Sequence, residues 1–231
     1  MAQWQLKNTN RVDIQVFSES NNWNDASHEM FASGSKNVLW EDREFLDLDF
    51  SSIGITLNFF EKCTFVKMNF SGNTWEDSEF EDSQFIKCNF ANITFKTCRS
   101  YRSTFEDCSF SQLGDFQFKF QECSFKNIDF SYSILNINIL DKLFVDCTFE
   151  NCKFNAIYFQ NVDFSKSKFN KCSFLSDTEN SINCLFDTCN LDYVEFKDCF
   201  FDKITPNNQF INSPVTKTIF KGLTSQNVPR F

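Results

Sequence analysis

Apolar residues recur along most of this chain at every fifth position, and the residue at that position is usually phenylalanine. Of the 33 phenylalanines, 24 lie on this series. The residue two positions before each of these centres is small or aliphatic, and the other three positions are mostly polar. A period of five fits neither the α-helix, with about 3.6 residues per turn, nor the flat β-strand, with two. The centres, called position i below, begin with Phe45, Phe50, Ile55, Phe60, Phe65, Phe70 and Trp75, and the series resumes after interruptions at Phe105, Phe144 and Phe186.

Each pentad predicts a short strand followed by a corner. Positions i−2 and i point inward with one outward residue between them, as they do on a strand. Positions i+1 and i+2 must then turn the chain, because the next pentad points inward again. Repeated corners wind the chain into coils that stack through backbone hydrogen bonds, about 4.8 Å per layer. The pattern therefore predicts an all-β solenoid.

The cysteines follow the same register. All 11 cysteines occupy position i−2, a slot that elsewhere holds serine, isoleucine or valine. Free cysteine behaves as a small apolar residue and is among the most buried residue types. A disulfide framework favours an even count in a small secreted chain, and a zinc site favours closely paired cysteines with histidines. Here the count is odd, the nearest cysteines are five residues apart and there is 1 histidine, so we expect buried, reduced cysteines.

Pentads such as CTFVK, CNFAN, CSFKN, CTFEN and CSFLS make residues 38–222 resemble the pentapeptide-repeat family. The resemblance implies a right-handed quadrilateral β-helix with four pentads per coil. A sign pattern agrees with a coil of this length, because charges twenty residues apart would then be stacked neighbours. Opposite charges on neighbouring strands are mildly favourable, and one such column alternates in sign: Asp42, Lys62, Asp82, Arg102, Glu122.

The domain organisation follows from where the pattern begins and ends. Residues 1–37 lie outside it and are predicted to form an N-terminal cap, since a solenoid needs its first coil covered. Within them, Val12, Ile14 and Val16 alternate like a strand, and a helical turn is expected near residues 25–31. Residues 38–222 form the predicted β-helix, and residues 223–231 form a C-terminal tail.

Composition narrows the possible functions. The net charge of −9 argues against direct nucleic-acid binding, which needs a basic surface. No apolar stretch is long enough to span a membrane and no apolar leader is visible, so we expect a cytoplasmic protein with no membrane contact. The one histidine, His28, lies in the predicted cap, and no nucleotide-binding, hydrolase or metalloprotease motif occurs. We therefore predict a non-enzyme without catalytic residues, cofactor or metal.

Three features are candidates for binding. The first is an acidic column, Glu41, Glu61 and Glu81, with Glu76 and Asp77 nearby; stacked like charges are unfavourable for stability alone, although Lys62 and Arg102 could neutralise them. The second is an outward apolar column, which either binds a partner or covers the corner. The third is the set of breaks in the pattern, which are either functional loops or drift. The apolar column consists of Leu46, Val66 and Ile86. The breaks lie at Ser100–Tyr101, at 114–116, near 139–141 as a one-residue deletion, and at the insertion 176–183 with Thr178, Glu179 and Asn180.

The family resemblance suggests one specific function. Pentapeptide-repeat proteins that protect gyrase and topoisomerase IV from antibiotics are acidic rods that mimic duplex DNA. They usually end in a dimerisation helix, but residues 202–231 here have no helical apolar stripe and contain Pro206, Pro214 and Pro229. The prediction is a protein partner, for example a DNA-binding enzyme such as gyrase, with topoisomerase modulation and antibiotic resistance as the outcome. The alternative is a scaffold, immunity partner or bacterial effector, and the oligomeric state stays open.

Overall fold

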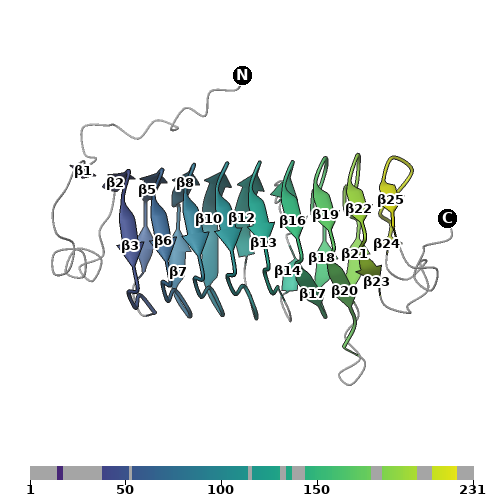
Figure 1. Ribbon diagram of the computed structural model, residues 1–231, viewed down its shortest axis with the longest axis horizontal. Helices are drawn as coiled ribbons and strands as arrows, with labels where there is room; N and C mark the ends of the chain where they lie inside the picture. Colours follow the sequence, from purple (N-terminus) through teal and green to yellow (C-terminus); the bar gives the residue numbers. More distant parts are fainter. Residues whose placement is uncertain are drawn as a thin grey trace.

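The protein forms an elongated four-sided β-helix (Figure 1). Its structure, a computed structural model, describes residues 15–17, 38–51, 54–113, 116–130, 134–136, 144–177, 184–201 and 210–222. These residues form short parallel strands, and they include no helix of the length and apolar character needed to cross a bilayer. Phe45 pairs with Phe65 and Phe65 with Phe85, so one regular coil takes twenty residues, or four pentads. The predicted all-β quadrilateral β-helix is confirmed.

The four sides are called faces 1 to 4 in chain order, and faces 1 and 2 carry most of the strands. Face 2 is an uninterrupted sheet of nine strands, all parallel, and it holds the surfaces discussed below. Face 1 consists of β1 (Gln15–Phe17), β2 (Val38–Glu41), β5 (Asn58–Glu61), β8 (Glu79–Glu81), the second halves of β10 (Thr94–Tyr101) and β12 (Phe116–Gln121), and β15 (Phe144–Val145). Face 2 consists of β3 (Glu44–Leu46), β6 (Thr64–Val66), β9 (Gln84–Ile86), β11 (Thr104–Glu106), β13 (Ser124–Lys126), β16 (Thr148–Glu150), β19 (Lys168–Asn170), β22 (Glu195–Lys197) and β25 (Ile219–Lys221).

Faces 3 and 4 are less continuous. Face 3 begins as single bridges from Asp49 through Asn69, Asn89, Ser109 and Asp129 to Lys153. It continues as β17 (Lys153–Asn155), β20 (Ser173–Leu175) and β23 (Phe200–Phe201). Face 4 consists of β4 (Ile55–Thr56), β7 (Thr74–Glu76), the first halves of β10 and β12, and then β14 (Ile134–Asn136), β18 (Tyr158–Gln160), β21 (Leu185–Asp187) and β24 (Phe210–Ile211).

Stacked phenylalanines fill the interior. Along face 2, the rings of Phe45, Phe65, Phe85 and Phe105 lie parallel with centroids 4.6–4.7 Å apart. Rings from neighbouring faces meet edge to face, as Phe60 and Phe65 do at 5.3 Å. Both arrangements suit the ring quadrupole, and each such pair contributes about 0.5–1.5 kcal/mol beyond the area it buries. The predicted lattice therefore forms one continuous aromatic core.

The corners force residues into the left-handed backbone conformation. Position i+2 has a φ between 49° and 64° at twenty-five non-glycine residues, among them Asp42, Lys62, Asp82 and Thr97. Asparagine and aspartate tolerate this region, whereas a β-branched residue in it is a real outlier. Thr97, with a φ of 57° and an exposed side chain, is such a residue.

Replacing Thr97 with asparagine is therefore expected to stabilise the protein by about 0.5–1 kcal/mol. The change removes branching at a left-handed residue without touching the core. Urea denaturation would measure it, with Thr94→Asn as the control. Thr94 lies on a β-strand, where the same change should be neutral or destabilising. A loss of stability in Thr97→Asn would contradict the strain at this corner.

Two of the predicted breaks compensate each other. Ser100 occupies a pentad centre between Phe80 and Phe120, where a ring would normally stack. Phe118 lies at position i−2 of the next coil, and its ring lies 6.3 Å from Phe80, 4.6 Å from Phe95 and 4.2 Å from Phe120. The ring of Phe118 thus fills the space that a phenylalanine at position 100 would take.

The break near residues 139–141 differs from its prediction. Phe144 pairs with Phe120, so this coil contains 24 residues and is four residues longer than a regular one. We expected a one-residue deletion, which was wrong. A deletion of one and an insertion of four shift a period of five identically, so the sequence register could not separate them. A longer insertion precedes β21, because Phe186 pairs with Phe159 across a coil of twenty-seven residues.

At the N-terminal end, β1 pairs with β2 on face 1, with Val16 opposite Leu39. This agrees with the strand expected around Val16. The helical turn expected near residues 25–31 lies outside the described residues, as does the tail 223–231. The assignment of all of residues 1–37 as a cap stays a prediction.

Candidate interaction surface

The predicted acidic column lies along the corner between faces 1 and 2. Glu41 pairs with Glu61 and Glu61 with Glu81 in consecutive parallel strands, which confirms the stacking expected from the sequence. Tyr101 follows Glu81 in the same column, so the stack of carboxylates ends at three. Position i+2, one residue further along the corner, carries the column that alternates in sign.

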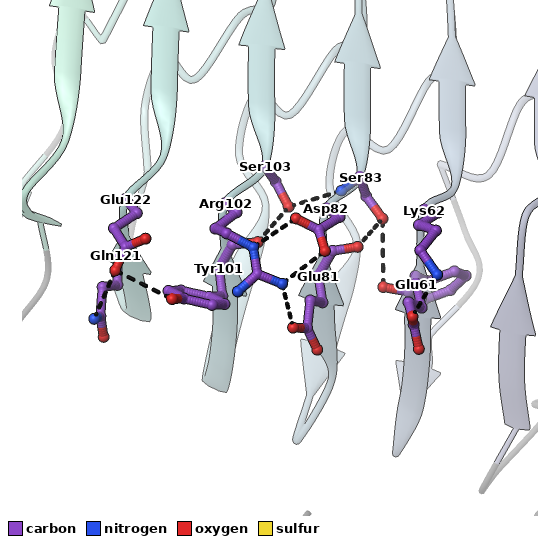
Figure 2. A network of polar contacts seen from close by, with 11 residues as sticks. Glu61, Lys62, Glu81, Asp82, Ser83, Tyr101, Arg102, Ser103, Gln121 and Glu122 are labelled. Carbon is purple, nitrogen blue, oxygen red and sulfur yellow. Dashed lines mark hydrogen bonds and ion pairs between the residues drawn. The ribbon is translucent and has the colours of Figure 1, made fainter. Parts of the chain in front are cut away.

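Cations from the alternating column neutralise part of this acidic stack (Figure 2). Lys62 Nζ lies 2.9 Å from Glu61 Oε1. The Arg102 guanidinium donates to Asp82 through Nε and Nη2, both at 2.7 Å, and to Glu81 through Nη2 at 2.6 Å. The hydrogen bond from Arg102 lowers the pKa of Asp82, and the hydrogen bond to Glu61 raises the pKa of Lys62. Lys62 and Arg102 thus pair with Glu61 and Glu81 of the acidic column, whereas Glu41 makes no ion pair with any described residue.

The network continues one coil further. The guanidinium carbon of Arg102 lies 4.1 Å from the centroid of the Tyr101 ring, and the Tyr101 hydroxyl donates to Glu122 at 3.1 Å. Such contacts between a cation and an aromatic face contribute about 0.5–1 kcal/mol at exposed sites. The strongest set of contacts on this corner thus holds neighbouring coils together, in addition to presenting charge.

The predicted apolar column lies on the opposite border of face 2. Leu46 pairs with Val66 and Val66 with Ile86, and the next residue in the column is Glu106. Leu46 is 52% exposed, whereas Val66 and Ile86 are half-buried. Only the end of the column is therefore free to contact a partner, and the other two side chains partly cover the corner, as the alternative interpretation expected.

Both columns border the same three strands, β3, β6 and β9, and we call this surface the N-terminal half of face 2. Its outward central positions are Glu44, Thr64 and Gln84. The surface therefore has an acidic border, a polar centre and an apolar border. The two columns were predicted as separate candidates, and in the structure they border the same strands.

Glu76 and Asp77 do not belong to this surface. Glu76 lies at the end of β7, between Thr56 and Lys96 in its column, at the corner between faces 4 and 1. Face 1 separates it from the acidic column. On that face Glu79 pairs with Arg99 at 3.4 Å, and burial raises the pKa of Glu79. Glu76 and Asp77 therefore form a distinct acidic corner and do not extend the acidic column.

The repeat pattern can now be compared with known proteins. The family model for pentapeptide repeats matches residues 143–174, with 8 copies. The same pentad geometry, with buried centres and left-handed corners, recurs in the described coils on either side of this segment. Residues 143–174 therefore contain pentapeptide repeats, and the coils on either side of them have the same geometry.

Similar solved structures include two pentapeptide-repeat proteins. One is HetL, described as involved in heterocyst differentiation regulation in the cyanobacterium Nostoc; it is 7% identical, with 85% of this chain and 90% of that chain covered and a TM-score of 0.40. Another is full-length QnrB1, described as a plasmid-mediated fluoroquinolone resistance protein; it is 17% identical, with 84% and 86% covered and a TM-score of 0.23. No curated protein sequence matches the chain.

The eleven cysteines are buried and free, which confirms the register prediction. Several of their thiols lie against two backbone carbonyls: Cys88 Sγ is 3.3 Å from the oxygen of Phe65 and 3.6 Å from that of Ile86. The Ser83 hydroxyl donates to the equivalent carbonyls of Phe60 and Glu81. The slot therefore favours a small side chain that also donates, which explains why cysteine and serine share it. Among the described residues no group of acidic, histidine or cysteine side chains could hold a metal ion.

Thiol labelling tests this slot. Burial raises the pKa of Cys63, Cys98 and Cys189 to about 12, and the thiolate is the reactive form. We expect few thiols to react in the folded protein at about pH 8, and about eleven after denaturation. Free cysteine ionises near pH 8.5–9, so the unfolded chain loses its thiol protons at a lower pH than the folded core does. The stability that comes from burying protonated thiols is therefore present below pH 9 and is lost as the pH rises toward 12. Rapid labelling of most cysteines in the folded state would contradict the register.

The remaining candidates have different outcomes. Thr178, Glu179 and Asn180 lie outside the described residues, so their role stays a prediction. Sequence reasoning missed the pairing of Glu79 with Arg99 and of Glu106 with Lys126, which lie 3.4 Å and 2.7 Å apart. Both pairs were detectable, because each joins opposite charges twenty residues apart.

Proposed function

We propose that this protein is a non-enzymatic, cytoplasmic rod that binds a protein partner through the N-terminal half of face 2. The observation that carries the proposal is the combination of a stacked carboxylate column and an exposed apolar residue on the two borders of β3, β6 and β9. Charge at the border increases the rate of association, and an apolar contact adds affinity. Reduced, buried thiols throughout the core fit a cytoplasmic location.

The most specific partner is a DNA-binding enzyme such as gyrase or another topoisomerase, which would meet the acidic rod in place of DNA. Residues 38–113 carry thirteen acidic and seven basic side chains. Spread over nearly four layers of about 4.8 Å each, this is roughly one net negative charge per 3 Å of rod. Duplex DNA carries about one per 1.7 Å. The rod thus supplies about half the charge density of DNA, enough for attraction that depends strongly on salt.

A supercoiling assay tests this partner. Added protein should inhibit gyrase, or protect it from a quinolone, and the effect should weaken at higher salt. Reversing Glu41, Glu61 and Glu81 to lysine should reduce the effect by about tenfold or more, chiefly through slower association. The control is Glu76→Lys with Asp77→Lys, two reversals on the separate acidic corner. If supercoiling is unchanged at both salt concentrations, gyrase is not the partner.

The second candidate is a scaffold, immunity or effector contact made by the apolar column. It is favoured by the 52% exposure of Leu46 and by the cations that already occupy Glu61 and Glu81. In that case Leu46→Ser with Val66→Ser and Ile86→Ser should abolish partner binding while the lysine triple leaves it intact. A photo-crosslinking residue at position 46 should capture the partner, and one at Thr74 on face 4 should not. The opposite pattern would favour the acidic column.

A further inference from the structure

Face 2 and its borders carry two sets of charged residues that match each other position by position. In the first coil, Asp42, Glu44 and Asp47 surround β3. Six coils later, three lysines occupy the same pentad positions around β19: Lys166 corresponds to Asp42, Lys168 to Glu44, and Lys171 to Asp47. All six side chains are exposed. The positions that are acidic around β3 are therefore basic around β19.

None of these six side chains forms an ion pair with another described residue. Other charges on the same surface are paired within the chain: Glu81 and Asp82 with Arg102, Glu106 with Lys126, and Glu195 with Lys221. Several charges on neighbouring coils are thus paired within the chain, while others among the described residues, such as Lys87 and Asp146, form no ion pair. The acids at β3 and the lysines at β19 form no ion pair of this kind, although Asp42 adjoins Lys62 and Lys168 lies opposite Glu195. The two sets cannot pair with each other within one chain, since six layers of about 4.8 Å separate them.

We propose that this surface binds a second copy of the chain, with the two rods antiparallel and face 2 packed on face 2. A twofold axis through β11 places β3 of one copy opposite β19 of the other, because β11 is the middle of the seven strands from β3 to β19. Each of Asp42, Glu44 and Asp47 then faces the lysine at the same pentad position. In an isologous dimer every contact occurs twice, which gives six opposite-sign contacts.

Between these ends the register also brings like charges together: Asp82 faces Glu122, and Arg102 and Asp107 meet their own copies at the axis. Within the chain, Arg102 already binds Asp82, and the Tyr101 hydroxyl already binds Glu122. Lys62, in the second coil, faces Asp146 in the sixth, again with opposite sign. At the axis, Thr104 points outward from β11 with a small side chain, and the Glu106 carboxylate there is already paired with Lys126. Seven layers of about 4.8 Å by roughly 16 Å of strand and corner give about 500 Å² per copy. That is below the usual size of a stable interface, so the dimer is expected to be weak and dependent on salt.

Such a dimer would cover β3, β6 and β9, and would compete with any partner on the N-terminal half of face 2. The inference does not rest on the proposed function, because it concerns the protein alone. Analytical ultracentrifugation tests it directly. We expect a monomer–dimer equilibrium at about 0.05 M salt, with the dissociation constant at least about tenfold higher at 0.5 M. A monomer at every salt concentration would overturn the proposal.

Charge reversal tests the register. Glu44→Lys with Asp47→Lys, and separately Lys168→Glu with Lys171→Glu, should each weaken self-association by about tenfold or more, because like charges then face each other. Mixing the two variants should restore a dimer, since their reversed ends are complementary. Glu76→Lys with Asp77→Lys changes the net charge equally on another corner and should leave self-association unchanged. Failure of the mixture to dimerise would overturn the antiparallel register, and binding of heparin without self-association would assign the lysines to a polyanion instead.

A crosslink tests the twofold axis. A Thr104→Cys variant should form a disulfide-linked dimer on mild oxidation, because the two substituted residues meet at the axis. Thr74→Cys is the matched control, with an equally exposed outward threonine on face 4. The native cysteines are buried and should not interfere. Equal crosslinking of the two variants would contradict packing through face 2.

Discussion

Replacing Phe90 with alanine is expected to lower the free energy of unfolding by about 3–5 kcal/mol. Phe90 is 1% exposed and stacks between Phe70 at 5.2 Å and Phe110 at 4.6 Å. Parallel backbone ladders above and below limit how far the neighbouring coils can close the cavity. Most of the cost of an unfilled cavity should therefore remain.

Phe200→Ala is the control for this prediction. Phe200 has the same side chain but lies at an outward position and is 47% exposed, so the change should cost less than about 1 kcal/mol. Urea denaturation would measure both variants, with an unchanged slope showing that the extent of unfolding is the same. Equal costs at the two positions would mean that the phenylalanine lattice is not the core.

The substitutions Ser100→Phe and Phe118→Cys are expected to be strongly coupled in their effects on the free energy of unfolding. Phe118→Cys alone removes the ring that fills the space above Phe80 and should cost about 3–5 kcal/mol. Ser100→Phe alone forces a second ring into an occupied space and should cost about 1–3 kcal/mol. The double variant restores a regular pentad centre with cysteine at position i−2, so its stability should return to within about 1 kcal/mol of the native protein.

A double-mutant cycle in urea measures this coupling. Ser100→Phe combined with Phe174→Cys, at a distant centre, is the control and should show additive costs. If the Ser100 and Phe118 changes were also additive, the two sites would not share one space, and the two breaks in the pattern would be unrelated.

The sequence was sufficient for the features that repeat. A phenylalanine or cysteine has a fixed place in each pentad, so its burial follows from its position, as it does for Phe90 and Cys88. Stacking also follows once a coil length is known, which is why Glu41, Glu61 and Glu81 were correctly placed in one column. Here the repeat converts a one-dimensional pattern directly into neighbours in space.

Features that depend on side-chain volume or on insertions could not be predicted in this way. Ser100 and Phe118 read as two separate irregularities, because their relation depends on where one ring points. The length of the coil leading to Phe144 was predicted wrongly. Two coil lengths that differ by five residues leave the following centres in the same register, so the sequence pattern cannot distinguish them. The acidic and apolar columns were treated separately, although they lie five residues apart along the chain and the pentad pattern places them on two successive corners.

The ladder of coils also has a mechanical consequence. Hydrogen bonds between coils, such as those from Thr64 to Arg43 and from Gln84 to Cys63, run along the long axis of the rod. Tension between the two ends therefore loads these bonds in series, one layer after another, instead of shearing many at once. Each regular coil that yields frees twenty residues, about 70 Å of extended chain. The rod is consequently built to lengthen in discrete increments, with the longest where a coil of twenty-seven residues precedes Phe186.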